Sequence, residues 1–169
     1  MFEKFYPNDY FESSYVIPYE ELYLQGYRGI IYDIDNTLVT HGAPADERSI
    51  ELIDRLKKIG FSITLLSNNK QPRVDLFNKD VNVNAISKAG KPSVSGYLEA
   101  CRVMGTSPDN TVFIGDQIFT DIWGAKKAGI MAYMVKYIDP HEEIQIILKR
   151  RLEYFVLREY FARKKKNKE

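Results

Sequence analysis

Residues 29–38 read GIIYDIDNTL, an apolar run that passes into two aspartates. The β-branched residues at its start, bounded by turn-forming residues, predict a buried strand. Side chains at positions i and i+2 of an extended chain point the same way, so Asp33 and Asp35 should share one face at the strand's carboxyl end. Two such carboxylates repel each other unless a cation lies between them or one is protonated. The pair alone fits a divalent-cation site, but it also fits an acidic turn that caps a strand.

The composition is that of a globular protein with a sizeable core. The chain has 169 residues, of which 44% are hydrophobic and 28% are charged. Its formal net charge is +1, so the whole molecule has no electrostatic bias towards nucleic acid. Cys101 is the only cysteine, which excludes an internal disulfide and a cysteine metal cluster. We find no signal-peptide core and no transmembrane segment, and we expect a cytoplasmic protein whose membrane contact, if any, is peripheral.

Helical and strand patterns alternate after the first strand. Helices are predicted at 46–59, 70–78, 92–104 and 118–128. Further strands are predicted at 61–66, 83–86, 110–114 and 130–135. This alternation implies a parallel sheet with right-handed crossovers. We therefore predict an α/β fold with a three-layer, α/β/α, Rossmann-like arrangement.

Polar residues follow most of the predicted strands. Because the loops after parallel strands converge on one edge of the sheet, these side chains are expected to lie together. They are Asp33, Asp35, Ser67, Asn68, Lys91, Asp116 and Asp121. Taken singly, each has an ordinary explanation, such as a turn serine, a solvated lysine or a surface aspartate in the first turn of a helix. Lys88 is a weaker competitor for the position of Lys91.

Four segments in order resemble the motifs of haloacid dehalogenase (HAD) phosphatases. They are DIDNT at 33–37, SNN at 67–69, KP at 91–92 and GDQIFTD at 115–121. Asn36 and the flanking residues of the second and third motifs are similar to the capless subfamily IIIA. Within that subfamily they resemble the group of phosphatidylglycerophosphate phosphatases. Between the motifs there is room for single helices and strands but not for a cap domain, so we expect an open site.

The resemblance implies a phosphomonoesterase that uses Mg²⁺ and an aspartyl-phosphate intermediate. It implies Asp33 as nucleophile, Asp35 as general acid and base, and Lys91 as the cation that neutralises the phosphoryl group. Mg²⁺ would be held by Asp33, Asp35 (through its backbone carbonyl), Asp116 and Asp121, the last directly or through water. Phosphate would be bound by Thr37, Ser67, Asn68 and Asn69.

The favoured substrate is phosphatidylglycerophosphate. Several alternatives stay open at this point: a nucleotide, a sugar phosphate, a nucleic-acid end or a phosphoprotein. A phosphatase fold that serves as a binding module for RNA or a membrane is a further alternative.

The two ends of the chain lie outside the motifs. Residues 1–28 are rich in aromatic residues and are predicted to form an arm packed on the core. Residues 29–161 are predicted to form the core and to end in an amphipathic helix, and residues 162–169 to form a basic, disordered tail. We expect the helix's apolar stripe to pack on the sheet; alternatively, stripe and tail contact an anionic membrane, or the tail binds RNA. The stripe consists of Ile144, Ile147, Leu148, Leu152, Phe155 and Val156.

Overall fold

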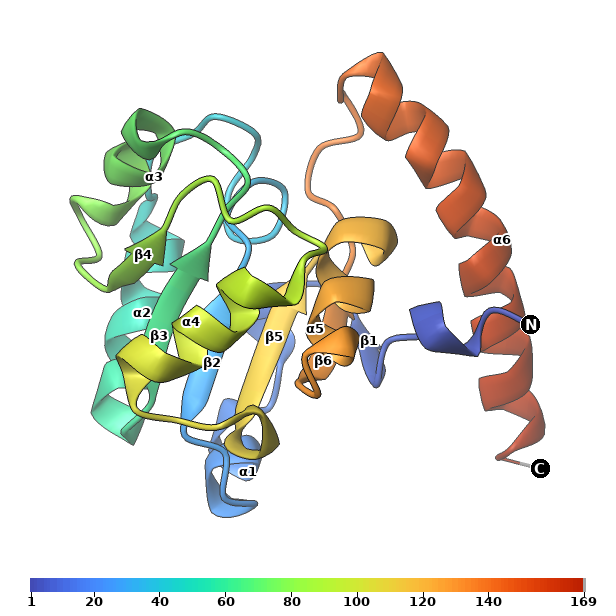
Figure 1. Ribbon diagram of the computed structural model, residues 1–169, viewed down its shortest axis with the longest axis horizontal. Helices are drawn as coiled ribbons and strands as arrows, with labels where there is room; N and C mark the ends of the chain where they lie inside the picture. Colours follow the sequence, from blue (N-terminus) through green and yellow to red (C-terminus); the bar gives the residue numbers. More distant parts are fainter. Residues whose placement is uncertain (169) are drawn as a thin grey trace.

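The computed structural model describes residues 1–168 and contains a six-stranded sheet with helices on both faces (Figure 1). Every neighbouring pair of strands is parallel, and the strand order is β1-β6-β5-β2-β3-β4. The strands are β1 (Asp9–Phe11), β2 (Gly29–Tyr32), β3 (Ser62–Leu66), β4 (Asn84–Ile86), β5 (Thr111–Gly115) and β6 (Met131–Val135). The predicted α/β class with a parallel, Rossmann-like sheet is confirmed.

Six α-helices accompany the strands. They are α1 (Tyr19–Leu24), α2 (Glu47–Ile59), α3 (Gln71–Asn78), α4 (Val94–Met104), α5 (Trp123–Lys127) and α6 (Ile144–Lys166). The segment predicted as one helix at 118–128 begins instead with a π-helical turn, Ile118–Ile122. The hydroxyl of Tyr97 donates to the backbone carbonyls of Thr120 and Asp121 in this turn, at 2.7 and 3.1 Å. A π-turn frees carbonyls from the helical ladder, and Tyr97 supplies the donor they need.

Successive residues of β2 alternate between two apolar cores. Ile30 and Tyr32 pack in the core that includes residues of α1, α2 and α3. Ile31 packs on the opposite face, with residues of α4, α5 and the π-turn. In Figure 1, α4 and α5 lie in front of the sheet and α2 lies behind it. The two-residue period of the strand thus produces the three layers.

The aspartate pair follows the central strand β2, which lies at the topological switch point of the sheet. β2 has β3 on one side and β5 on the other. Asp33 and Asp35 follow β2, Ser67 follows β3, and Asp116 follows β5. Ligands of open α/β sheets bind at such a switch point, beyond the carboxyl ends of the strands. The segments that join β2 to β3 and β3 to β4 hold only α2 and α3, so neither contains a cap domain.

The N-terminal segment, predicted as an arm packed on the core, also contributes a strand to the sheet. Its residues Asp9–Phe11 form β1, which pairs with β6 and becomes an edge strand of the sheet. Two side chains further on support the loop after β2: Ser14 Oγ donates to the Thr37 carbonyl at 2.8 Å, and Tyr15 Oη donates to the Leu38 carbonyl at 2.6 Å. The segment therefore helps to hold the loop that carries the aspartates.

The prediction that the apolar stripe of the C-terminal helix packs on the sheet is wrong for most of its residues. Val156 is buried, but Ile144 is 74% and Leu152 60% exposed. The inward side of α6 instead carries Arg150 and Glu153 together with Val156. These charged side chains turn inward because they pair with each other and with buried groups of the core. The exposed remainder of the stripe is Ile144, Ile147, Leu148, Leu152 and Phe155.

The basic tail does not begin as a disordered segment at residue 162, because α6 continues to Lys166. Arg163 pairs with Glu3 and Lys164 pairs with Asp9, so this end of α6 is fixed to the N-terminal segment. Figure 1 shows the N-terminus lying against α6. The last residue of the predicted tail, Glu169, lies outside the described residues. Across residues 1–168, no helix combines the length and apolar character needed to span a bilayer.

We predict that Tyr15→Phe lowers the free energy of unfolding by about 1 kcal/mol, because it removes the hydrogen bond to the Leu38 carbonyl. Urea denaturation measures the difference. The matched control is Tyr154→Phe on α6, where the side chain is 62% exposed and little change is expected. Equal stability of the two variants would contradict the supporting role of Tyr15.

Candidate active site

A cleft of 240 Å³ lies at the carboxyl edge of the sheet. Several of the residues predicted from the sequence line it, including Asp33, Asp35, Ser67, Asn68, Asn69, Lys91 and Asp121. The first turns of α6 and the segment before it contribute Glu143, Ile146 and Lys149 to the rim. The sequence therefore located this cleft, although α6 was not expected to border it.

Asp33 is almost buried and is surrounded by donors. Its Oδ1 accepts a hydrogen bond from Lys91 Nζ at 2.7 Å, and its Oδ2 accepts one from Thr37 Oγ1 at 3.1 Å. Burial raises the pKa of Asp33; Lys91 opposes the rise, and the carboxylates of Asp121 and Asp116 add to it. A further cation at this position would favour the ionised form of Asp33.

Lys91 joins Asp33 to Asp121. Its Nζ donates to each carboxylate at 2.7 Å, and its side chain is almost completely buried. Burial alone would lower the pKa of Lys91, but the carboxylates of Asp121 and Asp33 raise it, so the ammonium stays charged. The side-chain amide of Asn68 bonds both the backbone N–H and the carbonyl of Lys91, at 2.7 and 3.1 Å. Lys88, the competitor considered from the sequence, is exposed.

Asp121 is held from two sides. While its Oδ1 accepts from Lys91, its Oδ2 accepts from the backbone N–H groups of Asp116 and Gln117, at 3.2 and 3.1 Å. Gly115 leaves the space for this arrangement, since a Cβ there would lie 2.5 Å from Asp121 Oδ2. Asp121 is therefore placed to orient Lys91.

Asp35 lines the cleft but has partners of its own. Its Oδ1 accepts from the Gly42 N–H at 2.7 Å and pairs with Arg73 at 2.9 Å, and its Oδ2 accepts from Asn69 Nδ2 at 2.7 Å. His41 lies 3.7 Å from the same carboxylate. Arg73 was missed in the sequence because an arginine inside a short helix carries no distinctive spacing.

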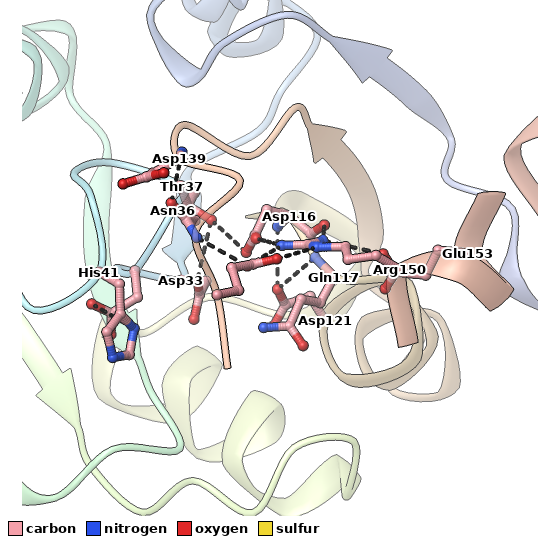
Figure 2. Close-up of polar contacts among 12 residues, drawn as sticks. Asp33, Asn36, Thr37, His41, Asp116, Gln117, Asp121, Asp139, Arg150 and Glu153 are labelled. Atoms are coloured by element: carbon pink, nitrogen blue, oxygen red, sulfur yellow. Dashed lines mark hydrogen bonds and ion pairs between the residues drawn. The ribbon is translucent and has the colours of Figure 1, made fainter. Parts of the chain in front are cut away.

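Asp116 is fully buried and contacts an arginine from α6 (Figure 2). Its Oδ2 accepts a hydrogen bond from Arg150 Nη2, and its Oδ1 accepts one from Thr37 Oγ1 at 3.2 Å. Burial raises the pKa of Asp116 to about 7, with Arg150 opposing the rise. Thr37, predicted to bind substrate, is buried between the Asp33 and Asp116 carboxylates and does not line the cleft.

The cluster fits a hard divalent cation. Carboxylate oxygens of Asp33, Asp116 and Asp121 lie within 4.8 Å of one another. Oxygen ligands of this kind suit Mg²⁺. Among the described residues, the ion-paired cluster around these oxygens contains more carboxylates than cations: Asp33, Asp116, Asp121, Glu142 and Glu153 against Lys91 and Arg150. The surplus of carboxylates over cations favours a bound cation, which would in turn favour their ionised forms.

Sequence comparison relates the chain to known hydrolases. The family model for haloacid dehalogenase-like hydrolases matches residues 41–129, a range that begins after the aspartate pair. The protein named "Probable phosphatase YqeG" of Bacillus subtilis is 36% identical over 137 residues, 80% of each chain. Phosphatidylglycerophosphate phosphatase 1 of Arabidopsis thaliana is 23% identical over 158 residues, which are 87% of this chain and 45% of that protein.

Solved structures share the fold. The cobalt-bound deoxy-D-mannose-octulosonate 8-phosphate phosphatase of Haemophilus influenzae aligns over 68% of this chain and 81% of its own, with a TM-score of 0.51 and 14% identity. NagD of Escherichia coli aligns over 67% of this chain and 89% of its own, with a TM-score of 0.54 and 14% identity. At such low identity the likeness concerns the fold alone.

We predict that Lys91→Met destabilises the metal-free protein by about 3–5 kcal/mol, because it leaves two buried carboxylates without their cation. The matched control is Lys88→Met, which changes an exposed side chain and should shift stability by less than about 0.5 kcal/mol. Chemical denaturation in the presence of a chelator measures both. Similar stabilities for the two variants would show that the ion pairs contribute little.

Proposed function

Because the chain belongs to the family of haloacid dehalogenase-like hydrolases, we propose that it is a Mg²⁺-dependent phosphomonoesterase that works through an aspartyl-phosphate on Asp33. The observation that carries the proposal is the placement of one buried ammonium, Lys91, against Asp33 and Asp121 at the edge of the cleft. A carboxylate that is oriented in this way, next to a fixed positive charge, is suited to attack phosphorus.

In the first step, an oxygen of Asp33 forms a bond to phosphorus while the bond between phosphorus and the leaving oxygen breaks. Asp35 gives its proton to that oxygen as it departs. Arg73 pairs with Asp35 at 2.9 Å and so helps to fix this carboxyl group in the cleft. Lys91 offsets the negative charge that gathers on the phosphoryl oxygens.

In the second step, Asp35 takes a proton from water, and the water oxygen attacks phosphorus. The bond between phosphorus and Asp33 breaks, which releases inorganic phosphate and restores the carboxylate. Ser67 and Asn69 line the same cleft and are assigned to the phosphate oxygens. Asn68 is assigned a different part, since its amide fixes the backbone of Lys91.

Mg²⁺ would be held by the carboxylates of Asp33 and Asp116 and by the backbone carbonyl of Asp35. When bound, it would supply charge stabilisation to the phosphate. The closely spaced oxygens of the carboxylate cluster support this assignment. Asp121 belongs to the same cluster and also holds Lys91, so we assign it to orient Lys91 or a metal-bound water.

The favoured substrate is a phosphate on a lipid head group, of the phosphatidylglycerophosphate kind. Two observations support it. Within residues 1–168 no cap domain covers the cleft, so a phosphate attached to a large assembly can enter. The similarity to phosphatidylglycerophosphate phosphatase 1 extends over 87% of the chain. A soluble phosphate ester or a 5′-phosphorylated nucleic acid would use the same chemistry.

The outward side of α6 is assigned to an anionic membrane surface. The exposed apolar residues Leu148, Leu152 and Phe155 form one strip along it. Arg151 and Arg158, three residues beyond Leu148 and Phe155, lie on the same side. An apolar strip with basic neighbours is typical of helices that lie in the membrane interface. RNA binding would use the arginines but would leave the apolar strip exposed to water.

We expect Asp33→Asn to lower turnover by at least about 1,000-fold, since the amide cannot attack phosphorus. Phosphate release is measured with Mg²⁺ and with EDTA from phosphatidylglycerophosphate in mixed micelles, an aryl phosphate, nucleoside monophosphates and a 5′-phosphorylated oligonucleotide. The control is Asp54→Asn at an exposed site on α2. Retained activity in Asp33→Asn would contradict the nucleophile assignment, and a preference for a soluble ester would contradict the lipid assignment.

The membrane assignment predicts that the double change Leu148→Asp, Leu152→Asp reduces binding to vesicles that contain phosphatidylglycerol by about tenfold or more, because two apolar side chains no longer enter the interface. Hydrolysis of the aryl phosphate should stay unchanged. Leu98→Asp, at an exposed position on α4, is the matched control. Binding is measured by vesicle sedimentation. Equal binding by the wild type, the double variant and Leu98→Asp would contradict the assignment.

A further inference from the structure

We propose that Arg150 is a positioning residue that orients Asp116 for metal binding and so makes α6 part of the metal site. The inference rests on the proposed function, which assigns the cation to Asp33 and Asp116. It goes beyond the matched family region, because Arg150 lies outside residues 41–129.

The first observation is that Arg150 grips Asp116 at two points. Its Nη2 bonds Oδ2 of the Asp116 carboxylate, and its Nη1 donates to the Asp116 backbone carbonyl at 2.5 Å. The other carboxylate oxygen, Oδ1, is 3.2 Å from Thr37 Oγ1, which also lies 3.1 Å from Asp33 Oδ2. Arg150 therefore binds Oδ2, on the side of Asp116 away from Asp33, while Oδ1 lies on the side of Thr37 and Asp33.

The second observation is that Arg150 is itself fixed by carboxylates. Glu142 accepts from Nε at 2.9 Å and from Nη2 at 2.8 Å, and Glu153 accepts from Nη1 at 3.1 Å. Glu153 also accepts the N–H of Ile118, in the π-turn after Asp116, at 2.7 Å. A guanidinium with its donors fixed in a planar fork sets both distance and direction for the group it holds.

The charges agree with an orienting role. A single arginine beside a metal-binding carboxylate would repel the incoming cation. Here Glu142 and Glu153 lie against the same guanidinium, so its positive charge is offset locally. The main effect of Arg150 on Asp116 is therefore to fix the position of its carboxylate. Figure 2 shows Arg150 lying between Glu153 and Asp116, with Thr37 and Asp33 on the far side of Asp116.

The network also reaches the aspartate loop. Glu142 Oε1 accepts from Asn36 Nδ2 at 3.0 Å, and Asn36 Oδ1 accepts from the Asp139 N–H at 3.0 Å. Asn36 has a φ of 61°, in the left-handed region that asparagine tolerates better than most residues. The segment that leads into α6 is thus bonded to the loop that carries Asp33 and Asp35, while α6 itself is bonded to Asp116.

The test is the affinity of the full-length protein for Mn²⁺, measured by electron paramagnetic resonance without substrate. Removing a residue that orients a metal ligand typically weakens affinity about 10–100-fold. We expect Arg150→Gln to do so, and to raise the Mg²⁺ concentration needed for half-maximal hydrolysis of an aryl phosphate by a similar factor. Arg102→Gln is the control, because Arg102 is exposed and pairs with Glu99 on the surface of α4. Unchanged or tighter Mn²⁺ binding by Arg150→Gln would overturn the inference.

A second variant decides the matter if Arg150→Gln fails to fold. Arg150→Lys keeps the positive charge beside Asp116, but one ammonium cannot span the carboxylate, the carbonyl and Glu142 with the same geometry. We expect weaker Mn²⁺ binding from Arg150→Lys than from the wild type, and wild-type affinity would overturn the inference. Failure of the proposed function gives a different result: the wild type itself would bind no Mn²⁺ and release no phosphate.

Discussion

The ion pairs of Lys91 with Asp33 and Asp121 hold the candidate site together. These three residues lie in segments that follow different strands, and one ammonium lies 2.7 Å from both carboxylates. Both carboxylates lie away from bulk water, and an unpaired charge in such a buried position would cost several kcal/mol. The pairing that fixes Asp33 in the cleft therefore also joins separate segments of the sheet edge through side chains.

Much of this arrangement follows from local sequence patterns. The strands β2 to β6 are short, mostly apolar runs bounded by turn-forming residues, so they can be predicted from the local sequence without knowledge of distant contacts. The match of Lys91-Pro92 to the family motif favoured Lys91 over Lys88, and the structure buries Lys91 while Lys88 stays exposed. By contrast, β1 has only three residues, and its strand conformation depends on pairing with β6 far along the chain. No local pattern carries that information.

The C-terminal helix shows a second limit of sequence patterns. Its apolar residues predict an inward face, yet Arg150 and Glu153 occupy that position. Hydropathy takes no account of the buried partners that a charged side chain can find, so it cannot say which side of this helix turns inward. The inward side of α6 is set by Asp116, because this carboxylate is fully buried beside α6 and pairs with Arg150. The same residue explains why Thr37 contacts carboxylates instead of the cleft: its hydroxyl lies 3.1 Å from Asp33 and 3.2 Å from Asp116, and its one hydrogen is shared between them.

The pairing of β1 with β6 has a consequence for the order in which the molecule is assembled. Asn8 Oδ1 accepts the Ala132 N–H across a separation of 124 residues, and Glu3 and Asp9 pair with side chains of α6. Residues 3–9 therefore acquire these native partners only after residues 132–164 have left the ribosome. Contacts of such long sequence separation slow folding, because bringing the two segments together costs the conformational entropy of the long chain between them. The segment that supports the aspartate loop therefore completes its own contacts only once α6 is present and docked.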